Sequence, residues 1–186
     1  MDIEFRISEL DRRLANMIQL GRIDTLDLSG DIPKAKVRFG ELVSPLLPFI
    51  TERAGEDLTW WPIDLNEQVI VFSPSGTLSM GIILGSINQK RFPSPTKDKD
   101  LHFTRYSDGA ETQYDKKAHK LSIILPSGGT TALVSDGGIK IKGKIDIEGD
   151  VTIAGDIDAS GDITDHTRSM QADRDIYETH LATYHT

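Results

Sequence analysis

Hydrophobic residues near the N-terminus follow a helical period. Over residues 1–20 they are separated by gaps of 4, 3, 4 and 3 residues, with charged residues between them. This is the heptad spacing of a short coiled coil. The positions are Ile3, Ile7, Leu10, Leu14 and Met17. Because so short a coiled coil is marginally stable by itself, two interpretations remain open: the helix self-associates, or it docks on the next domain.

The pattern then changes to short alternating strands. Ala35–Gly40 alternates with a period of two and ends at a glycine. Gln68–Phe72 reads as a buried strand closed by the turn sequence Ser73–Gly76, and Gly81–Gly85 is a further strand. Several short strands between Gly21 and about Asn88 favour a small antiparallel barrel, with an OB-fold as the leading candidate.

A polar segment rich in proline, residues 90–100, reads as a linker. After it, Leu101–Tyr106 and Glu111–Asp115 flank Ser107-Asp108-Gly109, which predicts a tight hairpin. Leu121–Leu125 is predicted as one more strand.

The most regular pattern lies between residues 137 and 164. All fourteen odd positions from 137 to 163 are glycine or apolar, whereas twelve of the fourteen even positions from 138 to 164 are polar. Glycine recurs every sixth residue, at Gly137, Gly143, Gly149, Gly155 and Gly161. Strands of globular proteins rarely exceed about 10 residues, and a short fixed period is typical of fibrous β structure.

This pattern creates a continuous apolar face that no other segment of the chain is long enough to cover. We therefore expect other copies of the chain to cover it, with three ribbons around one axis and the isoleucines inside. Glycine would mark bends or close approaches to that axis. The alternative is the left-handed β-helix of hexapeptide-repeat transferases. It is less favoured because the few hexads present make under about two turns, and no catalytic histidine lies between them.

Length and composition exclude several classes of function. A length of 186 residues suggests one or two domains, and a net charge of −8 argues against nucleic-acid binding as the main function. No apolar run approaches the length of a membrane span, and the N-terminal sequence does not resemble a secretory signal. The absence of cysteine excludes disulfides and thiolate chemistry.

The sequence carries no recognisable catalytic machinery. We find neither GxGxxG before a helix nor a phosphate-binding GxxxxGK[ST] loop. We therefore expect no enzyme activity. The adjacent Trp60 and Trp61 could contact a sugar or a partner, but packing in the core or between subunits is favoured.

Taken in order, these segments resemble the phage baseplate assembly protein V family, the central tail spikes of contractile phage tails and R-type pyocins. The resemblance covers nearly the whole chain. It rests on Gly21–Arg38, Thr59–Pro62, Glu67–Val69, Ser73–Gly76, Gly81–Leu84, Tyr106–Gly109, Tyr114–Asp115, Leu125–Gly128, Gly138–Gly143 and the stretch from Ser169 to Tyr177 with His180.

The resemblance implies an all-β homotrimer: an N-terminal OB-fold barrel followed by an intertwined, triple-stranded β-helix with a pointed C-terminal apex. We accordingly divide the chain into an N-terminal helix or coiled coil (1–20), an OB-fold collar (21–89), a linker (90–100), a β-helix shaft (101–164) and a metal-binding apex (165–186). The implied partners are the baseplate hub protein and the tail tube.

The implied function is structural. The spike would cap the tail tube and pierce the bacterial outer membrane when the sheath contracts. It would be located at the tail tip of a virion or tailocin, after assembly in the bacterial cytoplasm. The alternative, from a different class, is a trimeric fibrous binding module whose OB-fold binds carbohydrate or oligonucleotide.

The resemblance also implies an iron ion at the trimer apex, held by a His-x-His pair from each chain. His180 matches the first ligand of that pair. The sequence departs from the pattern because the next histidine comes five residues later, at His185. His102 and His119 are expected to be surface residues.

Charge changes sign along the even positions of the repeat. Lys140, Lys142 and Lys144 are followed by acidic residues from Asp146 to Asp162. We expect a solvated outer face that keeps the ribbon soluble. A second hypothesis is that the acidic part binds divalent cations that bridge lipopolysaccharide.

Overall fold

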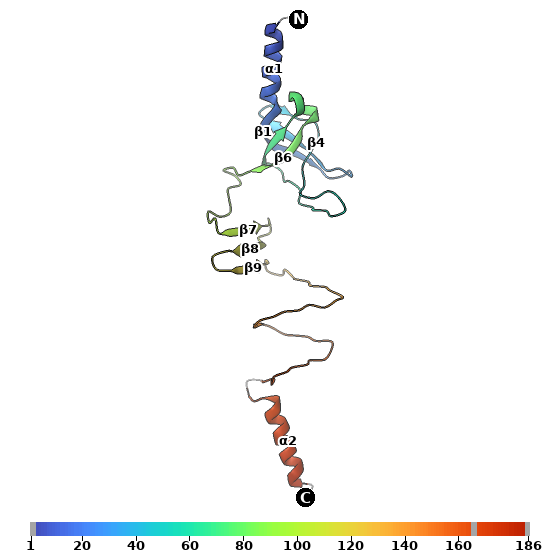
Figure 1. Cartoon of the computed structure of the whole chain (residues 1–186), viewed down its shortest axis with the longest axis vertical. Coiled ribbons are helices and arrows are strands. Elements are labelled where there is room, and N and C mark those ends of the chain that lie inside the picture. The colour runs from blue at the N-terminus through green and yellow to red at the C-terminus, as the bar shows by residue number, and fades with distance from the viewer. Residues whose placement is uncertain (1–2, 165–166, 185–186) are drawn as a thin grey trace. The chain divides into compact units, whose positions relative to one another are not determined.

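A computed structural model of the chain describes residues 3–164 and 167–184, with side chains as far as His180. Internal contacts divide the chain into two units, and their boundary in the sequence falls between Thr131 and Ala132 (Figure 1). In the described part of the chain, no helix combines the length and apolarity that crossing a membrane requires.

The chain begins with helix α1 (Ile3–Met17), which continues directly into strand β1 (Ile18–Asp27). This confirms the helix predicted from the heptad spacing, although it ends three residues before the predicted boundary. The backbone N–H of Ser73 donates to the carbonyl of Met17 at 2.7 Å. That bond ties the last turn of the helix to the barrel that follows.

A small antiparallel barrel follows the helix. Its sheet order is β3-β2-β1-β5-β6, and β4 pairs with β2. A parallel bridge between Phe49 and Ile83 joins the β4 end to β6 and closes the sheet. The remaining elements of the barrel are β2 (Lys34–Phe39), β3 (Leu42–Val43), β4 (Leu47–Pro48), β5 (Gln68–Phe72), η1 (Pro74–Gly76), η2 (Leu78–Met80) and β6 (Ile82–Ile87).

The barrel encloses the hydrophobic core of the first unit. Alternate residues of β2 and β5 point inward, which confirms the period-two pattern predicted for β2. Strands β5 and β6 form where the two apolar runs predicted buried strands. The core consists of Ile23, Ala35, Val37, Leu47, Val69, Val71 and Ile83. At Gly21, a Cβ would lie 2.9 Å from the carbonyl oxygen of Arg38. Only glycine therefore lets β1 approach β2 so closely.

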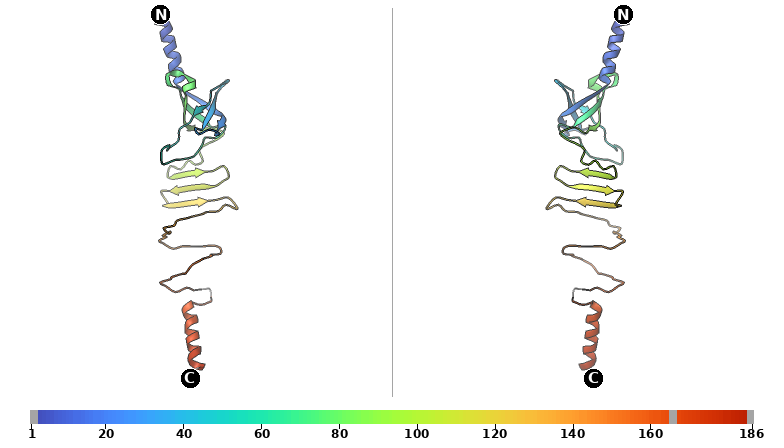
Figure 2. Two further views of the ribbon diagram at one scale, coloured as in Figure 1. Left: turned by 90° about the vertical axis from the view of Figure 1, so that its right-hand side faces the viewer. Right: turned by 90° about the vertical axis from the view of Figure 1, so that its left-hand side faces the viewer.

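A three-stranded meander completes the first unit. It consists of β7 (Leu101–Arg105), β8 (Glu111–Asp115) and β9 (Lys120–Ile124), each antiparallel to the next (Figure 2). Gly109 has φ +92° in the turn between β7 and β8. The Asp-Gly hairpin and the following strand are therefore as predicted.

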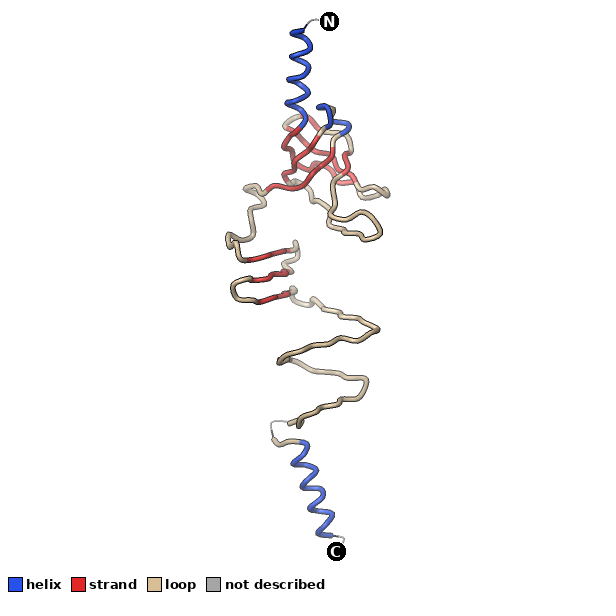
Figure 3. The backbone as a smooth tube through the Cα atoms, viewed as in Figure 1, coloured by secondary structure: helices blue, strands red, loops and turns tan. Residues whose placement is uncertain are grey.

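The second unit contains an extended segment and a helix. Between Ile124 and Met170 no strand occurs among the described residues, and the chain runs as extended passes (Figure 3). Helix α2 (Met170–Tyr184) follows. This helix was not predicted from the sequence, although it lies within the segment assigned to the apex.

Candidate assembly surface and apex

The hexad ribbon, residues 137–163, exposes an uncovered apolar face within a single chain. Every isoleucine and valine at its odd positions is exposed, by 44% at Ile163 and up to 66% at Ile141. Burying one such side chain is worth about 1.5–3 kcal/mol. These side chains contact no core of their own chain, so the ribbon requires a partner.

The backbone of the ribbon points to the same need. Its residues are extended but form no strand ladder within the chain, as the described residues between Ile124 and Thr164 show. Backbone N–H and C=O groups are strong hydrogen-bonding groups, and in an extended segment they form their hydrogen bonds with a neighbouring segment. Neighbouring copies of the ribbon would supply both the ladder and the apolar contacts.

Two hexad glycines are required by their backbone conformation. Gly143 and Gly149 both have φ +141°, which L side chains rarely adopt. No atom of the same chain lies within 4 Å of a Cβ built at either position. Within one chain, the bend therefore explains these two glycines, and crowding does not.

The even positions of the ribbon form an exposed charged face. Lys144 pairs with Asp146 at 3.3 Å, and both side chains are 86% exposed. So exposed a pair contributes little stability. The arrangement agrees with the predicted solvated outer face. Cation binding by the acidic part remains a prediction.

The segment assigned to the apex is helical. Ser169 caps α2, because its hydroxyl accepts a hydrogen bond from the N–H of Ala172 at 3.0 Å. Arg168 pairs with Asp173 at 2.5 Å in the first turn. The serine followed by Gln171 and acidic residues is the signal from which this helix could have been predicted.

The predicted metal ligands are only partly described. His180 lies in α2 and is exposed, whereas His185 lies outside the described residues. Within the described part of one chain, no group of three His, Cys, Asp or Glu side chains could hold a metal ion. A site built on His180 would therefore need imidazoles from several chains. His102 and His119 are exposed, as predicted.

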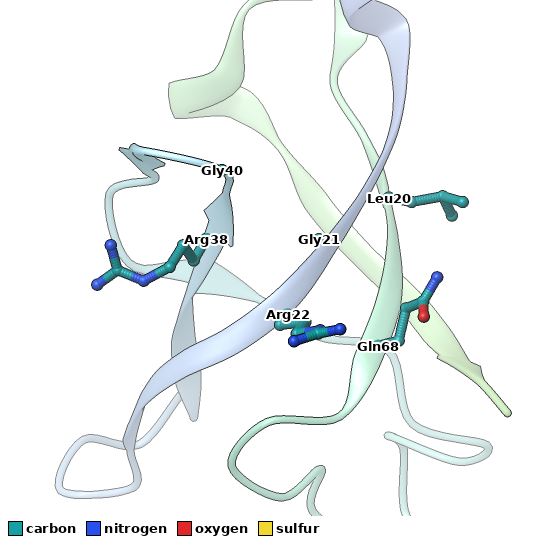
Figure 4. Close-up of a pocket in the computed structure, with 6 residues that line it drawn as sticks. All are labelled: Leu20, Gly21, Arg22, Arg38, Gly40 and Gln68. Atoms are coloured by element: carbon teal, nitrogen blue, oxygen red, sulfur yellow. The ribbon is translucent and has the colours of Figure 1, made fainter. Parts of the chain in front are cut away.

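The barrel carries a shallow groove between β1, β2 and β5. Leu20, Arg22, Arg38 and Gln68 line it (Figure 4). Nε of Arg38 donates to Asp24 at 2.8 Å, and this contact lowers the pKa of the Asp24 carboxyl. Because Asp24 neutralises Arg38, the groove lacks the strongly basic character of an oligonucleotide site.

The tryptophan pair is exposed rather than buried. Trp60 is 65% and Trp61 is 67% exposed, so packing in the core of the same chain, one of the favoured predictions, is wrong. The core is filled by aliphatic residues from alternating strand positions, and the loop that carries the pair lies outside it. Packing between subunits stays a prediction.

Trp61 nevertheless has an aromatic neighbour. Its ring stacks on Tyr106 beside a cleft of about 810 Å³. Other residues that line this cleft include Glu67, Arg91 and Arg105. In the sequence, Tyr106 is a residue of the predicted hairpin, and no local pattern connects it with the tryptophans.

Comparisons with known proteins cover both halves of the chain. Residues 19–87 match the family described as the type VI secretion system/phage-baseplate injector OB domain. Residues 102–165 match the family described as Gp138, beta helical trimerization domain. These matches confirm the predicted fold class, an OB-fold followed by a trimeric β-helix.

A curated relative matches across both domains. The chain is 34% identical over 132 residues to the spike protein of Escherichia phage P2. The aligned region covers 71% of this chain and 60% of the relative.

Proposed function

Because the chain belongs to the family of phage baseplate spike proteins, we propose that it is the structural central spike of a contractile injection machine. The machine is a phage tail or an R-type pyocin, and the spike sits at its tail tip. The observation that carries the proposal is the hexad ribbon, whose isoleucines are exposed in one chain and would be covered in a trimer.

The proposed role follows from this assembly. Three intertwined ribbons have paired backbones and no free sheet edges, which gives a stiff shaft. Such a shaft can transmit an axial force. The OB-fold barrels bind the baseplate hub protein and cap the tail tube, and the shaft pierces the outer membrane as the sheath contracts. This role requires no catalysis.

The native mass tests the assembly, and labelling of particles tests the location. Sedimentation of the full chain should give three times 20.6 kDa. Antibodies against the chain should label the tail tip, and particles made without it should lack a complete baseplate. A monomeric mass, or complete particles without the chain, would overturn the proposal.

We also propose an iron ion at the trimer apex, with His180 and His185 as ligands. Neutral imidazole is a suitable ligand for iron. The support is that His180 is exposed, so three chains could present three such groups to one ion. Elemental analysis of the purified trimer should find about one metal per trimer, and His180→Ala should lose it. Equal metal in both proteins would contradict the proposal.

The second candidate, a trimeric binding module, is favoured by one feature: the cleft beside the exposed Trp61. Exposed aromatic rings often stack on sugars. Glycan binding by the full chain, lost in Trp61→Ala with the trimer intact, would support this candidate. Loss of assembly in the same variant would support packing between subunits.

A further inference from the structure

Helix α1 presents an apolar stripe that the described residues of its own chain leave largely exposed. We call its heptad positions Ile3, Ile7, Leu10, Leu14 and Met17 the heptad seam. Four of these side chains are 53–71% exposed, and no residue of α1 is buried. A stripe this regular normally packs against another helix.

The closest approach of the helix to its own barrel involves its backbone. Gly76, with φ +70°, lies so close to α1 that a Cβ there would be 2.5 Å from the carbonyl oxygen of Arg13. The backbone N–H of Ser73 also donates to the carbonyl of Met17. Because the four seam residues before Met17 stay exposed, docking of the whole seam on the next domain, one of the two interpretations left open by the sequence, is wrong for this chain.

Three charged residues on the polar face of α1 pair with one another within the helix. Glu9 accepts hydrogen bonds from Arg12 at 2.8 Å and from Arg13 at 2.7 Å. The hydrogen bond with Arg12, and after it the one with Arg13, lowers the pKa of Glu9 to about 2. The charges of this face are solvated or paired, so the apolar seam is the side of α1 best suited to association with another helix.

We infer that the heptad seam packs against the same seam of two other copies, forming a parallel three-stranded coiled coil. The inference rests on the proposed trimer. A seam with alternating gaps of three and four residues packs against a helix that has the same spacing. The other copies of α1 are identical in sequence and therefore have this spacing. Chains already joined by their ribbons hold their helices at high effective concentration, which offsets the marginal stability of so short a coil.

The coiled coil would act directly on the barrels. Because α1 continues into β1 without a break, joining three helices fixes where three β1 strands begin. The N-terminal end of the trimer would thus be held by its own contacts, separate from those of the hexad ribbon.

Disulfide trapping tests the inference in the full chain. The protein has no cysteine, so any disulfide arises from the introduced residue. Leu10→Cys and Leu14→Cys each place a thiol in the seam, and Ser8→Cys places one on the outer face as a matched control. After mild oxidation, non-reducing electrophoresis should show linked dimers for both seam variants and at least ten-fold less for the control.

The outcomes separate the inference from the function on which it rests. A trimeric native mass with linked seam variants supports it. A trimeric mass without linkage at either seam position, or with equal linkage in Ser8→Cys, overturns it and leaves the proposed spike intact. The seam would then belong to another baseplate protein. A monomeric mass overturns the proposed trimer itself.

Discussion

The indole ring of Trp61 stacks on the phenol ring of Tyr106, with centroids 5.8 Å apart and planes 12° from parallel. Trp61 lies in the loop between β4 and β5, whereas Tyr106 directly follows β7. The stacked pair therefore connects the barrel with the first hairpin of the meander. Trp61 is 67% and Tyr106 is 48% exposed, so the contact contributes through stacking more than through burial.

Replacing Trp61 should weaken this connection. An aromatic pair of this kind is worth about 0.5–1.5 kcal/mol, so Trp61→Ala should lower the free energy of unfolding by about 1 kcal/mol. Trp61→Phe keeps a ring and should restore most of it. Urea unfolding followed by circular dichroism measures both. Trp60→Phe is the control, and an equal loss in Trp60→Phe and Trp61→Ala would argue against the stack.

Changing the polarity of a side chain should disrupt the trimer at an odd position of the hexad ribbon and leave it intact at an even position. Ile147→Asp places a charge on the apolar face, and burying an unpaired charge is strongly unfavourable. We expect loss of the trimeric mass in sedimentation. Ile145→Val keeps the face apolar, and Asp146→Asn alters the solvated face, so both should stay trimeric. Assembly of Ile147→Asp into normal trimers would contradict the assigned interface.

The glycines of the ribbon should not be equivalent. Gly149 has φ +141°, where a side chain is strained by about 1–3 kcal/mol. Gly155 has no such φ and open space around it within the chain. Gly149→Ala should therefore lower the melting temperature of the trimer clearly more than Gly155→Ala. The reverse order would show that crowding by partner chains decides where glycine is needed.

Gly21 should be a glycine on which the barrel depends. A Cβ there would lie 2.9 Å from the Arg38 carbonyl and 2.9 Å from the Phe39 ring. Overpacking of this kind costs about 1–3 kcal/mol, so Gly21→Ala should destabilise the chain by about 2 kcal/mol in urea unfolding. Gly55→Ala meets nothing within 4 Å and serves as the control. Equal stability of the two variants would refute the close approach.

The ion pairs of α1 should weaken in acid. The pKa of Glu9 falls from 4.5 to about 2 because Arg12 and Arg13 hold its charged form. A lowered pKa stabilises the helix above pH 4.5, and this contribution is lost as the pH falls toward 2. Helical circular dichroism of the wild type should fall in this window more than that of Glu9→Gln. Identical profiles would show that the pairs do not contribute.

Local patterns made much of the fold predictable. The alternation in β2 and β5 and the Asp-Gly turn at Gly109 depend on neighbours within a few residues, and each element forms as expected. The number and spacing of these short strands already favoured a small barrel, whereas the trimeric arrangement of the whole chain came from the resemblance. The fold class was therefore predictable where the spacing of residues and the fold implied by the resemblance agreed.

Features set by tertiary context were not predictable. Packing of Trp61 in the core of its own chain was expected, whereas the ring is exposed and stacks on Tyr106, which lies far away in the sequence. Helix α2 was missed because residues 165–186 were interpreted through the apex of the family rather than through the serine that caps the helix. The metal site depends on symmetry copies, and a single chain describes only His180 of the proposed pair.

The unpaired hexad ribbon has a genetic consequence. Each copy completes its ladder only with the other two. A chain with a defective ribbon that still enters a trimer therefore also impairs the two intact copies in that trimer. Mutations on the apolar face that still permit entry should therefore be dominant. When a defective gene and an intact gene are expressed together, most of the assembled particles would carry the defect.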